Sequence, residues 1–133
     1  MLALTRRLED RIREELGDGE MLEVAFDGLR SRWLPWSWPG EFLAQPCAVA
    51  LTSQRVLVLE VPRLSQSDAS VVLNAERSLV RVRRFTRTRR WQWTPLQGSW
   101  SRLEVELPDG QVKLYVDRAA RDAAAAFAAA VNE

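Results

Sequence analysis

The sequence predicts a mostly β protein with a helix at each end, folded as one domain over residues 1–133. Three observations predict this class. Leucine or isoleucine recurs every four residues at the start of the chain, several short runs in the middle alternate apolar with polar residues, and an alanine-rich run ends the chain. We therefore expect a bent antiparallel sheet or split barrel of about seven strands, with an N-terminal helix and a C-terminal capping helix.

The first expected element is an amphipathic helix over residues 1–17, ended by a glycine. Its apolar face is formed by Leu4, Leu8, Ile12 and Leu16. The sheet is expected over residues 20–116. Its first strand should place Leu22, Val24 and Phe26 on one face, and the following Asp27 and Gly28 are typical of a turn.

The next region, residues 29–46, mixes tryptophans with prolines and predicts a long loop containing an irregular strand. Two runs rich in leucine and β-branched residues follow at 47–52 and 56–61, which predicts a hairpin. A polar connection over 62–68 then leads to a short strand at 70–73.

Arginine alternates with valine or threonine over residues 79–88, and with aromatic residues over 89–93, which favours strands. The adjacent pair Arg83 and Arg84 indicates either a bulge or a turn that shifts the register. Runs at 103–107 and 112–116 flank a Pro-Asp-Gly turn and predict a second hairpin. Asp117 is suited to cap a helix over 118–131, whose apolar stripe is Ala123, Phe127 and Val131.

The residue inventory argues against catalysis. The chain has no histidine and a single cysteine, Cys47, so a Ser-His-Asp or Cys-His arrangement and an internal disulfide are excluded. Cys47 lies in an apolar run and is expected to be a buried, unreactive thiol. We therefore predict a non-enzymatic protein with no catalytic residues, metal site, cofactor or small-molecule substrate.

Cellular location is predicted from apolar runs. No run approaches the roughly 18 to 20 apolar residues of a spanning helix, and the first residues lack the apolar stretch of a signal peptide. We expect a cytoplasmic protein, with any membrane contact peripheral and at the inner face.

Charge is strongly polarised along the chain. Residues 77–102 hold eight arginines and no acid, a charge of +8. Residues 1–76 hold eight bases and twelve acids, and residues 103–133 hold three and six, giving −4 and −3. These sum to the net charge of +1. A concentrated positive segment favours an anionic partner.

Two short motifs resemble the bacterial pleckstrin-homology and GRAM-like group. One is Gly19-Glu20 before the first strand, and the other is Leu51-Thr-Ser-Gln-Arg55-Val-Leu across the first hairpin. The resemblance covers most of residues 17–131 and implies a small non-enzymatic module that binds phospholipid headgroups, peptides or other domains. It also implies core positions at Leu51 and 56–59, with Thr52 and Arg55 ordering the turn.

The lipid-binding members of that group hold phosphates with basic residues near the loop after the first strand. Arg30, Arg32, Trp33 and Leu34 match the second half of their pattern, but no Lys or Arg lies between Glu14 and Leu29. The resemblance therefore implies at most a weaker anion or membrane site at this loop.

The first candidate site combines arginines with tryptophans in the long loop: Arg30, Arg32, Trp33, Trp36 and Trp38. These rings either form an exposed contact for a partner or lipid surface, or pack on the sheet or on a second subunit. The second candidate is a basic surface on the later strands: Arg81, Arg83, Arg87, Arg89, Trp91 and Trp93. Its alternative is a half-buried strand with a solvated face, whose arginines pair with Glu104 and Glu106.

Three functions follow from these patterns. We expect first a module for protein interaction or self-assembly, because aromatic residues and arginine are typical interface anchors. The alternative is binding to an anionic membrane surface through the arginine-tryptophan loop. The least supported is binding to single-stranded nucleic acid, with Trp91 and Trp93 stacking on bases.

Overall fold

A computed structural model describes residues 1–30, 45–62, 64–87 and 100–132 of the chain. Within these residues lie eight strands in one sheet and two α-helices, one near each end. The helices are α1 (Arg6–Glu14) and α3 (Arg121–Val131), and two short 3-10 turns are η1 (Gln66–Asp68) and η2 (Arg77–Leu79). The strands are β1 (Leu2–Ala3), β2 (Leu22–Arg30), β3 (Gln45–Thr52), β4 (Arg55–Glu60), β5 (Ser70–Glu76), β6 (Arg81–Arg87), β7 (Ser101–Leu107) and β8 (Gly110–Val116).

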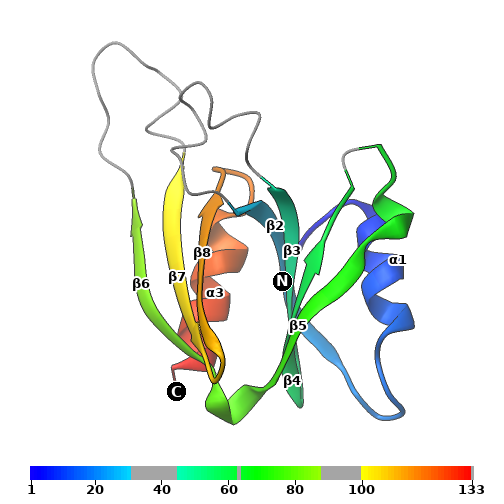
Figure 1. Ribbon diagram of the computed structural model, residues 1–133, viewed down its shortest axis with the longest axis horizontal. Helices are drawn as coiled ribbons and strands as arrows, with labels where there is room; N and C mark the ends of the chain where they lie inside the picture. The colour runs from blue at the N-terminus through cyan, green and yellow to red at the C-terminus, as the bar shows by residue number, and fades with distance from the viewer. Residues whose placement is uncertain (31–44, 63, 88–99, 133) are drawn as a thin grey trace.

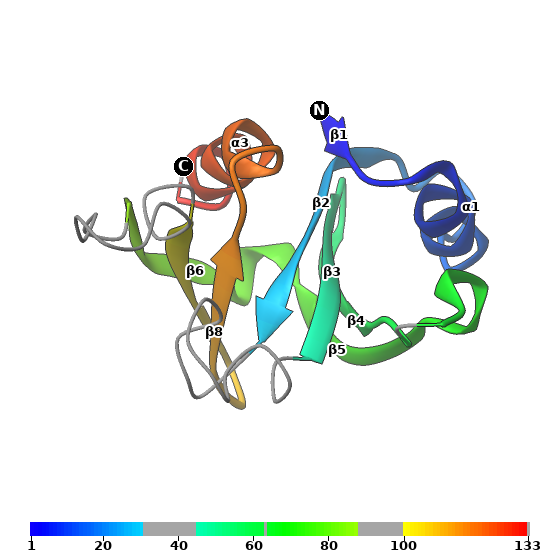
Figure 2. The same cartoon turned by 90° about the horizontal axis from the view of Figure 1, so that it is seen from above.

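The main strand order is β5-β4-β3-β2-β8-β7-β6, and all neighbours in it are antiparallel. The two-residue β1 pairs in parallel with β2. The sheet is strongly bent, so that β3, β4 and β5 face β6 and β8 across the interior (Figures 1 and 2). This open, bent antiparallel sheet with two helices confirms the predicted mostly β class.

The bend lies where β2 crosses β8, because these strands share only two register pairs, Leu29 with Tyr115 and Arg30 with Leu114. Gly28 precedes the crossing. A Cβ atom there would lie 3.0 Å from the carbonyl oxygen of Tyr115, so the close approach favours glycine. The predicted turn at Asp27 and Gly28 is therefore wrong, since β2 continues through both residues to Arg30.

The predicted face of β2 is also wrong at Leu22. A register shift leaves Glu23 without a partner on β3, because Leu22 pairs with Thr52 and Val24 with Leu51. Such a bulge reverses the alternation of faces. Leu22 consequently packs against the outer cluster, whereas Val24 lies in the inner core.

Two hydrophobic clusters cover the two faces of the bent sheet. The inner cluster packs α3 against the strands, with Phe26 and Phe127 in edge contact at 5.6 Å between ring centroids. The outer cluster packs Leu8 and Ile12 of α1 against β2, β3 and β4. Figure 2 shows the two helices on opposite sides of the β2–β3 region. The predicted stripe of the C-terminal helix is thus buried in full. In the N-terminal stripe Leu8 and Ile12 are buried, whereas Leu4 and Leu16 are half-buried and lie outside α1.

The helix boundaries differ from those predicted. Thr5 caps α1, its Oγ1 accepting from the Leu8 N–H at 3.4 Å, so the helix begins at Arg6 and leaves room for β1. Asp117 accepts from the Ala120 N–H at 3.0 Å, but it caps a preceding turn, and α3 begins at Arg121. The predicted helices at 1–17 and 118–131 are therefore each too long.

Both predicted hairpins are confirmed, as β3–β4 and β7–β8. The predicted bulge is confirmed too, since Val82 pairs with Val105 and Arg84 with Glu104, leaving Arg83 without a register partner. The polar connection over 62–68 is confirmed and contains η1. The strand predicted at 70–73 continues to Glu76.

Candidate functional site

Only part of the predicted sites lies within the described residues. Arg30 ends β2 and is exposed. Arg81 and Arg83 lie on β6, and Arg87 is its last residue. The remaining predicted site residues lie outside the described residues: Arg32, Trp33, Trp36, Trp38, Arg89, Trp91 and Trp93.

The strand ends that flank segments 31–44 and 88–99 share one end of the sheet. Arg30 pairs with Gln45 across β2 and β3, and Arg87 pairs with Ser101 across β6 and β7. Leu64, between β4 and β5, lies at this end as well and is fully exposed, at 101%.

Three exposed arginines of β6 form what we call the β6 arginine surface, namely Arg81, Arg83 and Arg84. Val80 and Val82, which alternate with Arg81 and Arg83 along the chain, are buried, and this confirms the predicted alternation of faces. This edge strand thus presents consecutive guanidinium groups to solvent.

Carboxylates neutralise this surface only weakly. The Arg83 Nε lies 3.7 Å from a Glu106 oxygen, and both side chains are more than half exposed. Glu104 pairs instead with Arg102, at 3.0 Å. No described carboxylate forms an ion pair with Arg81 or Arg84. The predicted pairing across the strands is therefore confirmed only for Glu106 with Arg83, and most of the charge stays in place.

The free edge of β6 is closed at one point by the residue after α3. The Val82 N–H donates to the Asn132 side-chain oxygen at 3.0 Å, and the Asn132 amide nitrogen donates to the Val82 carbonyl at 3.0 Å. One carboxamide thus takes the place that a neighbouring strand would occupy.

A buried ion pair joins the two motifs of the family resemblance. Arg55 donates to Glu20 from Nε at 2.9 Å, and the Thr52 hydroxyl donates to the same carboxylate at 2.5 Å. The Thr52 oxygen also accepts the Arg55 N–H at 3.0 Å, which confirms that both residues order the turn. Glu20 was not predicted to take part, because its partners lie over thirty residues away.

Glu20 is held in its charged form. Burial alone would raise its pKa, but the hydrogen bonds from Arg55, Thr52 and the Gly17 N–H outweigh burial and lower the pKa to about 2. A carboxylate so fully bound has no free capacity to act on a ligand. We assign this network to the stability of the β3–β4 turn.

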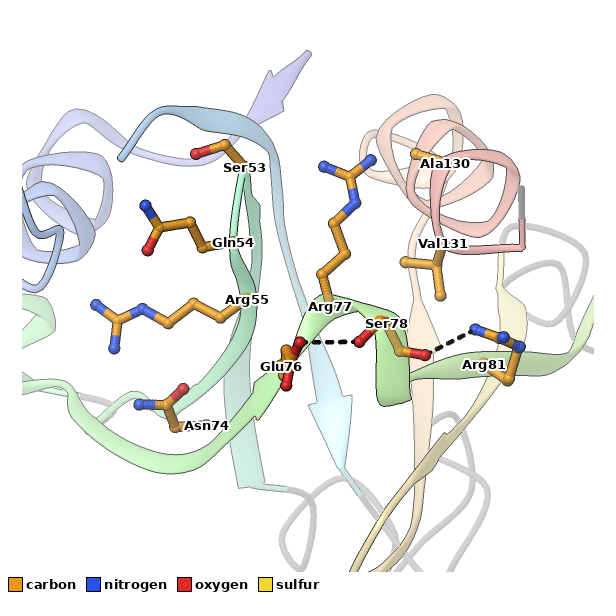
Figure 3. Close-up of a pocket in the computed structure, with 10 residues that line it drawn as sticks. All are labelled: Ser53, Gln54, Arg55, Asn74, Glu76, Arg77, Ser78, Arg81, Ala130 and Val131. Atoms are coloured by element: carbon orange, nitrogen blue, oxygen red, sulfur yellow. Dashed lines mark hydrogen bonds between the residues drawn. The ribbon is translucent and has the colours of Figure 1, made fainter. Parts of the chain in front are cut away.

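A groove of about 880 Å³ lies between the β3–β4 turn, η2 and the end of α3. Figure 3 shows that its arginines diverge, with Arg55 directed away from α3, Arg77 directed between the sheet and α3, and Arg81 on the far side of η2. Arg55 is paired with Glu20, and Arg77 donates to Glu23 and to the Thr52 carbonyl. The groove therefore lacks convergent donors for an anion.

A smaller pocket of about 280 Å³ opens into the inner face of the bent sheet. Its apolar lining combines β5, η2 and the β7–β8 hairpin, as Leu73, Ala75, Leu79, Leu107 and Val112. Arg30 lines it from β2. Sequence reasoning missed this pocket because the bend of the sheet creates it from segments far apart in the chain.

The thiol of Cys47 has the expected character. It is 1% exposed, and burial raises its pKa to about 11, so it stays protonated at neutral pH. Among the described residues, no group of three potential ligands is placed to hold a metal ion. In the same part of the chain, neither helix has the length and apolar character needed to cross a membrane.

No protein-family model matches the chain, and neither does any curated protein.

Proposed function

We propose that this chain is a non-enzymatic binding module on a pleckstrin-homology-like frame. The support is its strand order β5-β4-β3-β2-β8-β7-β6, bent at the β2–β8 crossing, with α3 packed against the inner face. The buried contact among Glu20, Thr52 and Arg55 adds to this support, because it joins the two motifs that carry the family resemblance.

The module binds an acidic region of a partner protein, and the β6 arginine surface is the observation that carries this proposal. Arg81, Arg83 and Arg84 lie together on one edge strand with little neutralisation by described carboxylates. Exposed charge of one sign attracts a complementary surface and speeds its association. Arginine also suits carboxylate partners, because its planar group bonds both oxygens at once.

Binding to poly-glutamate tests this function. The test variant changes Arg81, Arg83 and Arg84 to Glu. The control changes three other exposed arginines, Arg6, Arg7 and Arg118, to Glu and so has the same net charge. We expect salt-sensitive binding that the control keeps and the test variant loses. Equal loss in both variants, or tighter binding of a single-stranded oligonucleotide than of poly-glutamate, would contradict the proposal.

A second candidate function is contact with an anionic membrane surface, favoured by Leu64. Its side chain is fully exposed at the end of the sheet where Arg30 lies. An exposed apolar side chain and a basic one at the same end of a sheet suit the boundary between headgroups and acyl chains. Vesicles with and without phosphatidylglycerol distinguish this function, because it predicts sedimentation with the anionic vesicles alone and its loss in Leu64→Asp.

A further inference from the structure

The opposite edge of the sheet, β5, differs from β6 in what it exposes. In the described part of the chain, β5 pairs only with β4. Its seven residues include one charge, Glu76, and no cation. Val72 is a bulge residue, since Val71 pairs with Leu59 and Leu73 with Val58. The regular part of this edge is therefore the run from Leu73 to Glu76.

The hydrogen-bond ladder shows which backbone groups of this run face outward. The Arg77 N–H donates to the Gln54 carbonyl at 3.0 Å, and Ala75 pairs in register with Val56. Bonded residues alternate along an antiparallel pair, so Leu73, Ala75 and Arg77 point their backbone groups at β4. The N–H and C=O groups of Asn74 and Glu76 consequently face away from β4, toward the free edge.

The 280 Å³ pocket lies beside this free edge. Leu73 and Ala75 line it from β5 and are half-buried, whereas Leu79 is 55% exposed at its mouth. Leu107 and Val112 line it as members of the inner core. A strand bonded to Asn74 and Glu76 would direct the side chain opposite Ala75 to this same face of the sheet. That side chain would enter the pocket.

The charges around the pocket specify the incoming strand. Glu76 lies on the edge and is exposed. The residue that faces Glu76 should therefore be basic. Arg30 and Asp109 both line the pocket and carry opposite charges, so the side chain that enters it should be uncharged. In an antiparallel partner these two residues are consecutive, the basic one first.

We propose that the β5 edge at Asn74 and Glu76 binds an extended segment of a partner protein in which a basic residue precedes an apolar one. Main-chain hydrogen bonds hold the segment, and the pocket selects its apolar side chain. This site lies on the opposite edge of the sheet from Arg83 and Arg84 and takes a partner of opposite charge.

This site is tested by selecting, from a library of displayed random peptides, those that bind the full chain. Asn74→Pro is the decisive variant. Proline removes the one outward N–H of Asn74 and leaves the ladder to β4 intact. Asn74→Ala, which keeps that N–H, is the matched control. We expect selected peptides to share a basic-apolar pair, to bind the control like the original chain, and to bind Asn74→Pro about tenfold more weakly.

Reversal of the edge charge is the second arm, and it also covers the case in which Asn74→Pro fails to fold. Glu76→Lys should shift the selected peptides from a basic to an acidic residue at the same position. A variant with only Arg83 and Arg84 changed to Glu, which leaves Arg81 beside the β5 edge in place, should bind the original peptides unchanged. This separates the site from the proposed function. The inference is overturned if the selected peptides share no basic-apolar pair. It is also overturned if Asn74→Ala loses as much peptide binding as Asn74→Pro, or if Glu76→Lys still selects a basic residue.

Discussion

The two edge strands of the sheet, β5 and β6, differ in how their unpaired backbone groups are protected from pairing with another strand. β6 presents a row of exposed arginines, and Asn132 occupies the outward backbone groups of Val82. β5 has no basic residue, and only one bulge and one glutamate hinder its pairing with another strand. Charge and a capping side chain are common protections of a sheet edge. β5 is therefore the edge suited to accept a strand, and β6 is the edge suited to attract an acidic partner.

The two sides of the sheet also differ in how they are held together. The strands next to β5 meet at the turn organised by the buried Glu20 and Arg55 pair, whose carboxylate side chain is 2% exposed. The strands next to β6 have the Arg102 and Glu104 pair, with side chains 32% and 16% exposed. Loss of a partner costs most where the remaining charge is buried.

The largest expected effect is therefore on the β5 side. Arg55→Gln leaves the buried Glu20 carboxylate without its cation and should lower the free energy of unfolding by about 3 kcal/mol, measured by urea denaturation. Arg102→Gln is the matched change on the β6 side, leaves the more exposed Glu104 carboxylate and should cost about 1 kcal/mol or less. Equal costs in the two variants would remove the contrast between the two sides.

Acid should loosen the β5 side first. The pKa of Glu20 is lowered to about 2 in the folded chain, from an ordinary value of 4.5, so its contribution to stability is present above pH 4.5. That contribution is lost as the pH falls from 4.5 toward 2. Amide hydrogen exchange at pH 3 should show β3, β4 and β5 losing protection relative to β7 and β8. Uniform loss across the sheet would contradict this order.

Removal of the cap on β6 should make the two edges more alike. Asn132→Ala leaves the N–H and C=O of Val82 without a partner and should cost about 2 kcal/mol, with faster exchange at the Val82 amide. Asn132→Asp is a useful control, because it keeps an acceptor for the N–H but no donor for the carbonyl. An unchanged exchange rate in Asn132→Ala would show that Val82 is protected in another way.

The smallest effect on stability is expected at the β6 arginine surface. Arg83→Gln removes an exposed ion pair with Glu106 and should change the free energy of unfolding by less than about 0.5 kcal/mol. Its binding to poly-glutamate should nevertheless weaken and become less salt-sensitive. A large loss of stability would instead assign Arg83 to the fold.

Local patterns were sufficient to predict some features of the sheet. The Pro-Asp-Gly hairpin and the bulge at Arg83 depend on residues close together in the chain, and both are confirmed. Gly28 was misassigned because its role depends on Tyr115 in a crossing strand. β5 was predicted too short because Asn74 and Ala75 are poor strand formers, although pairing with β4 keeps them extended.

The candidate sites were harder to predict for the same reason. Alternation identified Arg81 and Arg83 as exposed, since it depends only on neighbours within one strand. The β5 pocket and the partners of Glu20 depend on how the sheet bends and on contacts between distant segments. Sequence patterns carry no signal for such contacts.

The most direct test of two edges with opposite partners is a pair of NMR titrations of the full chain. One uses a peptide selected for a basic-apolar pair, and the other uses poly-glutamate. We predict that the first shifts the amide signals of Asn74 and Glu76, and that the second shifts those of Arg81, Arg83 and Arg84. Shifts at the same edge with both ligands, or at neither edge, would contradict the account.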